Sequence, residues 1–137
     1  MRFWVTHLND ELAEVIVGNT GKWLEDVLTE MNRFTKENPG EIIFFRMNYL
    51  IDLRKVPSLG PIYWTQDIVD DFFTHLKTLN NWCGDLEKGF HNQKASYFMD
   101  RNDGAGCVIF VLDGHLNDVK TSTAPTDGIY PASQMNF

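Results

Sequence analysis

The chain has 137 residues, of which 43% are apolar, and its 12 basic and 19 acidic residues give a net charge of -7. This length and composition predict one domain with a packed core rather than a disordered chain. The negative charge opposes nucleic acids and anionic bilayers as partners held by bulk electrostatics, and no apolar run in the sequence approaches the roughly 20 residues of a membrane span.

The first predicted element is a buried strand over residues 1–7, because an apolar Phe-Trp-Val run near the start ends in a Thr and in His7. Residues 8–20 predict a linking loop. At the end of this loop, Asn19 or Thr20 is suited to cap the helix that follows.

A helix is predicted over residues 21–38, because apolar side chains recur there at steps of three and four and so form one stripe. The stripe consists of Leu24, Val27, Leu28, Met31 and Phe34. The helix ends at Asn38-Pro39-Gly40, since the Pro39 ring disfavours helical backbone before it and Gly40 permits a sharp reversal. A strand over 41–48 follows, and its four consecutive apolar residues indicate burial on both faces.

The second half of the sequence predicts a long loop, a second helix and a third strand. Residues 49–63 have no clear period, and a loop of this length in a compact domain is more often functional than merely connecting. The apolar pattern then predicts a helix over 65–79, a short helix over 93–99 and a strand over 107–112. From Asp113 onward no further element is predicted.

The order of strand, helix, strand, helix, strand favours an α/β fold with parallel strands and right-handed crossovers. Three strands are few for such a fold, because a doubly wound sheet commonly has about five or six and a (β/α)8 barrel needs about 250 residues. We therefore expect this chain to be a piece of a larger domain.

Two cysteines, Cys83 and Cys107, leave the redox compartment open. They could form a disulfide, or they could remain two separate thiols with Cys107 buried in a strand, because the geometry of a disulfide cannot be read from sequence. Neither has a Cys or His neighbour at the spacing typical of a metal site.

One continuous stretch resembles a known family. The run WLEDVLTEMNRFTKENPGEIIFF is similar to the segment of phosphatidylinositol-specific phospholipase C-like phosphodiesterases in which a helix leads through an Asn-Pro-Gly-Glu signature into a barrel strand. The resemblance is closest to the fungal branch of that superfamily. The matching positions are Gly18, Gly21, Asn32, Phe34, Thr35, Asn38, Pro39, Gly40 and Glu41.

The resemblance implies an incomplete TIM-type (β/α) barrel, of which this chain holds the middle portion, and phosphodiester cleavage by two histidines at strand ends. One histidine acts as general base on a substrate hydroxyl and the other as general acid to the leaving group. An arginine or a metal ion, with calcium as the candidate in this family, balances charge on the phosphoryl oxygens. His7 lies where the family has its second histidine; the alternative is an ordinary loop histidine. We expect the first histidine to lie upstream of Met1.

Four further residues close or follow predicted strands and are candidates for substrate binding. Arg46 and Asn48 stand at the end of the second strand, and Asp113 and His115 follow the third, where α/β folds place their chemistry. The alternatives are a solvated strand end for the first pair and an ordinary Asp-Gly turn for the second. No residue is assigned to a metal.

The sequence thus predicts a phosphoric diester hydrolase of the phospholipase C-like type, whose complete relatives act on phospholipid-type phosphodiesters. Because a missing general acid or base typically costs a factor of about 10²–10⁴, two other interpretations stay open for this chain. One is a catalytically inactive remnant, and the other is a small α/β binding module whose similarity is accidental. Complete relatives are often secreted, but their signal would lie upstream of Met1, so the compartment and the oligomeric state are left open.

Overall fold

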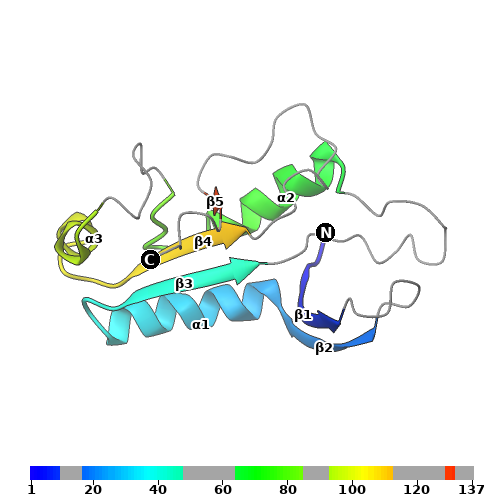
Figure 1. Ribbon diagram of the computed structural model, residues 1–137, viewed down its shortest axis with the longest axis horizontal. Helices are drawn as coiled ribbons and strands as arrows, with labels where there is room; N and C mark the ends of the chain where they lie inside the picture. Colours follow the sequence, from blue (N-terminus) through cyan, green and yellow to red (C-terminus); the bar gives the residue numbers. More distant parts are fainter. Residues whose placement is uncertain (10–16, 48–63, 85–92, 113–128, 132–137) are drawn as a thin grey trace.

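The computed structural model describes residues 1–9, 17–47, 64–84, 93–112 and 129–131. Within these residues the chain forms a three-stranded parallel sheet, a separate two-stranded antiparallel hairpin and three helices (Figure 1). The α/β class with three parallel strands, which the sequence predicts, is therefore confirmed.

The parallel sheet has the strand order β3-β4-β5, so neighbouring strands are also consecutive in the sequence of described elements. β3 (Ile42–Met47) and β5 (Ile129–Pro131) lie on either side of β4 (Cys107–Leu112). All six residues of β4 are buried, as expected for a central strand whose two faces are both covered.

Helices pack on both faces of β4, because alternate side chains of a strand point to opposite faces. The even-numbered residues of β4 share a hydrophobic core with α1 (Leu24–Glu37) and α2 (Gln66–Leu76). The odd-numbered residues share a second core with Phe98 of α3 (Ala95–Arg101). Figure 1 shows α1 running along one side of β3 and β4, with α3 beside the start of β4.

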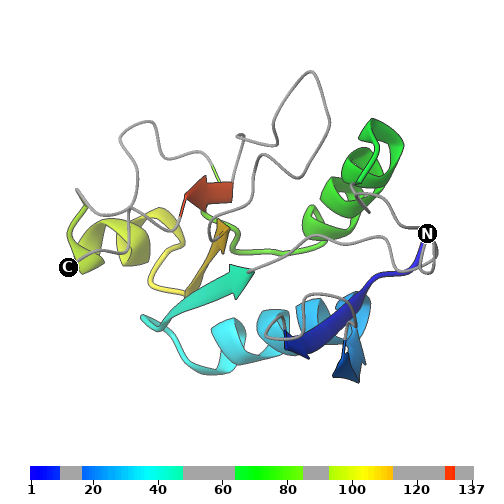
Figure 2. The same ribbon diagram turned by 45° about the vertical axis from the view of Figure 1, so that its right-hand side comes forward.

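The first predicted strand does not join the parallel sheet, which corrects the sequence prediction. β1 (Trp4–Asn9) pairs antiparallel with β2 (Val17–Trp23), and Figure 2 shows this hairpin beside the first turns of α1. The third parallel strand is instead β5, in a part of the sequence where no element is predicted. Asn19 and Thr20 lie within β2, so the predicted loop and helix cap are wrong there.

The helix predicted over 21–38 begins only at Leu24, because residues 21–23 continue β2 and Trp23 pairs with Trp4 of β1. Trp23 stands at the cap position without a side-chain capping bond. The first helical N–H, that of Leu24, instead donates to the carbonyl of Phe3 at 2.8 Å. The entry to α1 is therefore fixed by the start of the chain rather than by a local cap.

The buried stripe of α1 differs from the predicted one at its end. Leu24, Leu28, Met31 and Thr35 are buried, whereas Phe34 is 42% exposed. At roughly 100° per residue, the four buried positions lie within about 40° of one direction, and Phe34 lies about 80° from it. A polar residue, Thr35, therefore takes the core position that the pattern assigns to Phe34.

The turn from α1 to β3 is built by the Asn-Pro-Gly sequence as predicted from local rules. The Asn38 side chain and backbone N–H both donate to the carbonyl of Phe34, at 2.9 and 2.8 Å, and so satisfy the end of the helix. Gly40 has φ of +84°, a conformation in which a side chain would be strained.

The prediction that the strand over 41–48 is buried on both faces is wrong, because no residue of β3 is fully buried and its second half is covered on one face only. Phe44 is 40% exposed and Arg46 is exposed, while their neighbours are partly buried.

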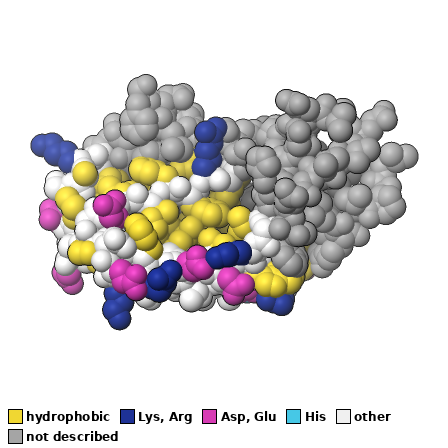
Figure 3. Space-filling view, turned by 90° about the horizontal axis from the view of Figure 1, so that it is seen from below, with side chains coloured by type: hydrophobic (Ala, Val, Ile, Leu, Met, Phe, Trp, Pro, Cys, Tyr) yellow, Lys and Arg dark blue, Asp and Glu magenta, His cyan; other side chains and the backbone are white. Residues whose placement is uncertain are grey.

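Figure 3, which views the molecule from the α1 side, shows hydrophobic side chains bordered by a row in which acidic and basic side chains alternate. Neither sign of charge dominates that face.

The helix predicted over 65–79 ends at Leu76, because the chain then tightens into turns in which the Thr78 N–H donates to the carbonyl of His75 and the Leu79 N–H to that of Leu76.

None of the helices in the described part of the chain has both the length and the apolar character needed to cross a membrane. Cys83 and Cys107 form a disulfide, which decides between the two alternatives for the cysteines.

Candidate functional site

The three parallel strands end level with one another. Met47 pairs with Leu112, and Leu112 pairs with Pro131, so the last residue of each strand stands at one carboxyl edge. In open and closed α/β sheets this edge is the place where ligands bind. Asn48 and Asp113 are the next residues of the chain after β3 and β4, and they lie outside the described residues together with the third candidate of this region, His115.

Arg46 lies one residue before this edge, opposite Val111 of β4. Side-chain alternation puts Arg46 on the same face of β3 as Ile42, which packs against the core that contains Phe98. The guanidinium therefore belongs to the face opposite α1 and α2. In a (β/α) barrel, where helices form the outer ring, the face opposite the helices is the inner one.

His7 does not lie at a strand end of the parallel sheet. Its backbone is inside β1, opposite Asn19 of β2, and the strand continues to Asn9. The expectation that the strand ends in His7 is therefore wrong, although the structure does not describe the His7 side chain. Strand pairing places His7 in the hairpin and Arg46 in the parallel sheet, so no hydrogen-bonded ladder links these two candidates.

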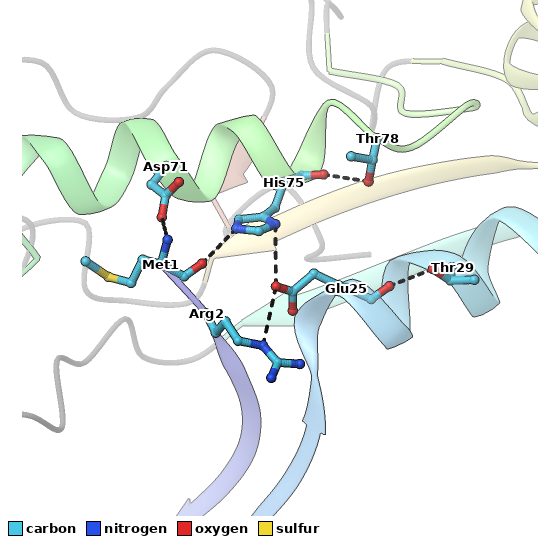
Figure 4. A network of polar contacts seen from close by, with 7 residues as sticks. All are labelled: Met1, Arg2, Glu25, Thr29, Asp71, His75 and Thr78. Carbon is cyan, nitrogen blue, oxygen red and sulfur yellow. Dashed lines mark hydrogen bonds and ion pairs between the residues drawn. The ribbon is translucent and has the colours of Figure 1, made fainter.

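The structure also assembles a polar cluster that the sequence does not predict. We call it the N-terminal clasp and define it by Met1, Arg2, Glu25, Asp71 and His75, which come from three separate segments (Figure 4). The Met1 nitrogen lies 2.6 Å from Asp71, and the Met1 carbonyl lies 3.0 Å from Nε2 of His75. Glu25 faces Nδ1 of His75 at 3.8 Å and Nε of Arg2 at 4.0 Å.

Two further contacts hold the clasp in place. The Arg2 guanidinium lies 3.8 Å from the centre of the Trp23 ring, a cation–π distance. The ring of Phe3 meets the His75 ring edge to face, with centroids 5.5 Å apart. The hydrogen bond from the Met1 ammonium lowers the pKa of Asp71, partial burial opposes this, and the charges of Met1 and His75 add to the lowering.

The clasp contacts hold Met1 and Arg2 against α1 and α2. A carbonyl oxygen can only accept, so Nε2 of His75 donates its hydrogen to Met1, and Nδ1 is turned toward the Glu25 carboxylate. Both ring nitrogens thus face groups of the protein. Sequence reasoning assigns His75 no role; the spacing of four between Asp71 and His75 places both on one side of α2, but their partners come from distant segments that no local pattern reveals.

Two of the residues on which the predicted family resemblance rests, Asn32 and Thr35, join α1 to the segment after α2. The Asn32 side chain donates to the carbonyl of Thr78 and accepts from the N–H of Asn80, both at 2.9 Å. The Thr35 hydroxyl accepts from the Asn81 side chain at 3.3 Å. Asn32 and Thr35 therefore have structural partners within the chain.

No metal site is formed by the residues that the structure describes, because no three His, Cys, Asp or Glu side chains gather there at binding distance. Calcium therefore stays a prediction from the resemblance, and no chemical step is assigned to it. Comparison with protein-family models, with curated proteins and with solved structures finds no match for this chain. Arguments about function therefore rest on the residues themselves.

Proposed function

We propose that this chain is the middle portion of a phospholipase C-like phosphodiesterase barrel and that its carboxyl edge binds the phosphodiester of a phospholipid-type substrate. The observation that carries the proposal is the level ending of three parallel strands that are consecutive in the described chain. Barrel strands follow one another in this way, and catalytic and binding residues of barrels stand at the carboxyl ends of several strands.

In this proposal the residues have separate roles. Arg46 faces the inner side of the sheet and pairs with the phosphoryl oxygens, a contact that an arginine can make with two parallel hydrogen bonds. Asn48, Asp113 and His115 follow strand ends and contact the head group. His7 supplies one of the two proton transfers, and the partner histidine is supplied from upstream of this chain.

Binding tests this proposal without requiring turnover. The probe is glycerophosphoinositol, titrated into the isotopically labelled chain while backbone amide shifts are recorded by NMR. Arg46→Ala should weaken binding about 10- to 100-fold, because the lost contact is a hydrogen bond to a charged group. Arg33→Ala is the matched control, since Arg33 lies on the outer side of α1 with Glu37 at 3.6 Å and should leave the affinity unchanged. Absence of binding, or equal effects of the two variants, would refute the proposed site.

Turnover is tested with phosphatidylinositol and with a chromogenic phosphodiester, with and without calcium. We expect a folded chain with a single catalytic histidine to be slower than a complete enzyme by about 10²–10⁴. Any residual turnover should be lost in His7→Ala and kept in His91→Ala, because His91 is assigned no role. Turnover that is unchanged in His7→Ala would remove His7 from the chemistry.

A second function is favoured by a specific observation. Phe98 and Tyr97 of α3 cover the face of the sheet that a barrel would enclose, and β1 pairs outside the sheet. Helices on both faces are typical of a free-standing open sheet. The chain would then be a small α/β binding module or an inactive remnant. It should unfold in one cooperative transition, bind no glycerophosphoinositol and show no turnover.

A further inference from the structure

The second edge of β4 is shared by two short segments. Near the start of β4, Trp82 forms a parallel bridge to Val108, and Cys83 N–H donates to the carbonyl of Val108 at 2.9 Å. Near the end of β4, the three residues of β5 pair with residues 110–112. A strand of three residues makes few ladder bonds, so its place on the sheet depends strongly on side-chain anchors.

The disulfide joins the first of these segments to β4. Cys83 is 2% exposed and Cys107, the first residue of β4, is 1% exposed, and 24 positions separate them in sequence. Both sulfur atoms lie in the core on the α3 side of the sheet, together with Phe98 and Ile109. The bond therefore fixes the Cys83 backbone against β4 from inside the core.

β5 is anchored on the same cysteine. Tyr130 is 6% exposed, belongs to the core that holds both cysteines, and donates its hydroxyl hydrogen to the carbonyl of Cys83 at 3.1 Å. The amide of Asn102 also reaches toward the Cys83 sulfur at 3.9 Å. The position of Cys83 thus determines whether the acceptor for Tyr130 is in place.

We propose that the Cys83–Cys107 disulfide is a redox-dependent latch for β5. While the bond is closed, Cys83 is held where its carbonyl receives the Tyr130 hydroxyl, and the third parallel strand stays on the sheet. When the bond is reduced, Cys83 keeps its backbone bond to Val108 but loses its covalent tie, and β5 loses part of its anchor.

The redox step balances as an ordinary thiol–disulfide exchange. A thiolate of a dithiol reductant attacks one buried sulfur, and the second thiol of the reductant then resolves the mixed disulfide. The reductant is oxidised to its own disulfide, and the two electrons and two protons that it gives up convert Cys83 and Cys107 to thiols. A small-molecule disulfide such as oxidised glutathione closes the latch by the reverse exchange. Because both sulfur atoms are buried, the latch opens only from states in which the α3 side of the sheet has locally opened.

Hydrogen exchange tests the latch. The purified chain is compared in oxidised form and after reduction by dithiothreitol, with the state of the cysteines checked by intact mass after alkylation. Amides of β5 should exchange about 10-fold faster or more in the reduced chain, whereas those of α1 and β3 should change much less, since local opening is independent of the distant core. The variant Cys83→Ala/Cys107→Ala should behave like the reduced chain.

A second variant keeps the test decisive if the cysteine variant does not fold. Coupling is reciprocal, so weakening the anchor must also ease opening of the bond. Tyr130→Phe removes the one hydroxyl and should speed reduction by dithiothreitol about 2- to 10-fold, the factor that one hydrogen bond corresponds to. Tyr97→Phe is the matched control: its hydroxyl accepts from Arg101 at 2.9 Å, and it should reduce at the wild-type rate.

Four results would overturn the proposal. The first is that Cys83 and Cys107 are both free thiols in the chain purified without reductant, which would mean that the disulfide does not form. The second is equal β5 exchange in the oxidised and reduced chains. The third is equal reduction rates for Tyr130→Phe and Tyr97→Phe. Faster exchange spread evenly over α1, β3 and β5 would also count against it, since that pattern is global destabilisation.

Discussion

Replacing Thr35 by valine removes a buried hydroxyl while keeping the shape of the side chain. Thr35 is 1% exposed, and its hydroxyl donates to the carbonyl of Met31 at 3.0 Å and accepts from the Asn81 side chain at 3.3 Å. The Met31 carbonyl lies within α1, where the helix ladder also offers it a donor. The main loss therefore falls on the partly buried Asn81 amide, whose acceptor disappears.

The expected cost follows from these partners. Leaving a partly buried donor unsatisfied costs about 1–3 kcal/mol, and the Asn81 bond is long, so we expect Thr35→Val to lower the free energy of unfolding by about 1–2 kcal/mol. Thr35→Ser keeps the hydroxyl and removes one buried methyl, which corresponds to about 1 kcal/mol. Thr35→Ala removes both and should cost about the sum of the two.

Urea unfolding followed by tryptophan fluorescence measures these free energies, with the slope of the transition used to check that the unfolded state is unchanged. A double-mutant cycle with Asn81→Ala separates the hydrogen bond from packing, and we expect a coupling of about 1 kcal/mol. A coupling near zero, or a Thr35→Val variant as stable as the wild type, would mean that the hydroxyl has no energetic role and that the reasoning is wrong.

Three other perturbations have defined outcomes. Gly106→Ala should cost about 1–3 kcal/mol in urea unfolding, because the new Cβ would lie 2.9–3.1 Å from atoms of Thr35 in α1 and from the carbonyl of Glu41, just before β3. Gly104→Ala meets nothing within 4 Å and should cost only the strain of its φ of +83°. Asn32→Ala should lower the free energy of unfolding by about 1–2 kcal/mol in the same assay, since it breaks two hydrogen bonds to backbone groups after α2. Stability equal to the wild type would show that these two hydrogen bonds do not stabilise the fold. The pKa of Asp71 is lowered by the Met1 ammonium, so its stabilising effect should be present above the unfolded pKa and lost as pH falls through the folded one. Asp71→Asn should therefore be less stable than the wild type at pH 7 and equal to it in strong acid, and a pH-independent difference would contradict this.

Local patterns predict the elements whose burial is decided by their own sequence. The α1 helix, the Asn-Pro-Gly turn and the apolar runs of β3 and β4 all lie where periodicity and turn chemistry place them, within a few residues. Phe34 and Thr35 show the limit of this reasoning. Which of two neighbouring helix positions faces the core depends on the partner surface, and here the close approach of Gly106 and the Asn81 side chain leaves room for a threonine.

The elements that the sequence does not predict depend on pairing between segments. β2 has a Val-Gly-Asn-Thr-Gly sequence that reads as a loop, and it is extended because β1 supplies its hydrogen bonds. β5 is three residues long, too short for any periodic signal, and owes its place to β4 and to the anchor of Tyr130. In both cases pairing with another segment determines the extended backbone, and a local sequence pattern does not contain that information.

For the candidate site, too, the local sequence pattern predicts some positions and misses others. Arg46 lies beside the carboxyl edge, as the rule about strand ends predicts, and its exposure agrees with a polar strand end. The end of the apolar run predicts that His7 lies at a strand end, but antiparallel pairing with β2 extends the strand to Asn9. Asn48, Asp113 and His115 remain predictions, since they lie outside the described residues.

The pairing of β3 with β4 has a consequence for synthesis of the chain. Ile42 pairs with Cys107, so 65 positions (107 minus 42) separate residues that become neighbours. At about 5–20 residues per second, β3 waits for roughly 3–13 s after it leaves the ribosome before its partner strand exists. During that interval the Ile-Ile-Phe-Phe run has no partner strand for its backbone hydrogen bonds, and its apolar side chains lack the cover that the complete sheet provides. The β3–β4 pair therefore cannot form until β4 has been synthesised, and slower elongation between β3 and β4 should lower the yield of folded chain.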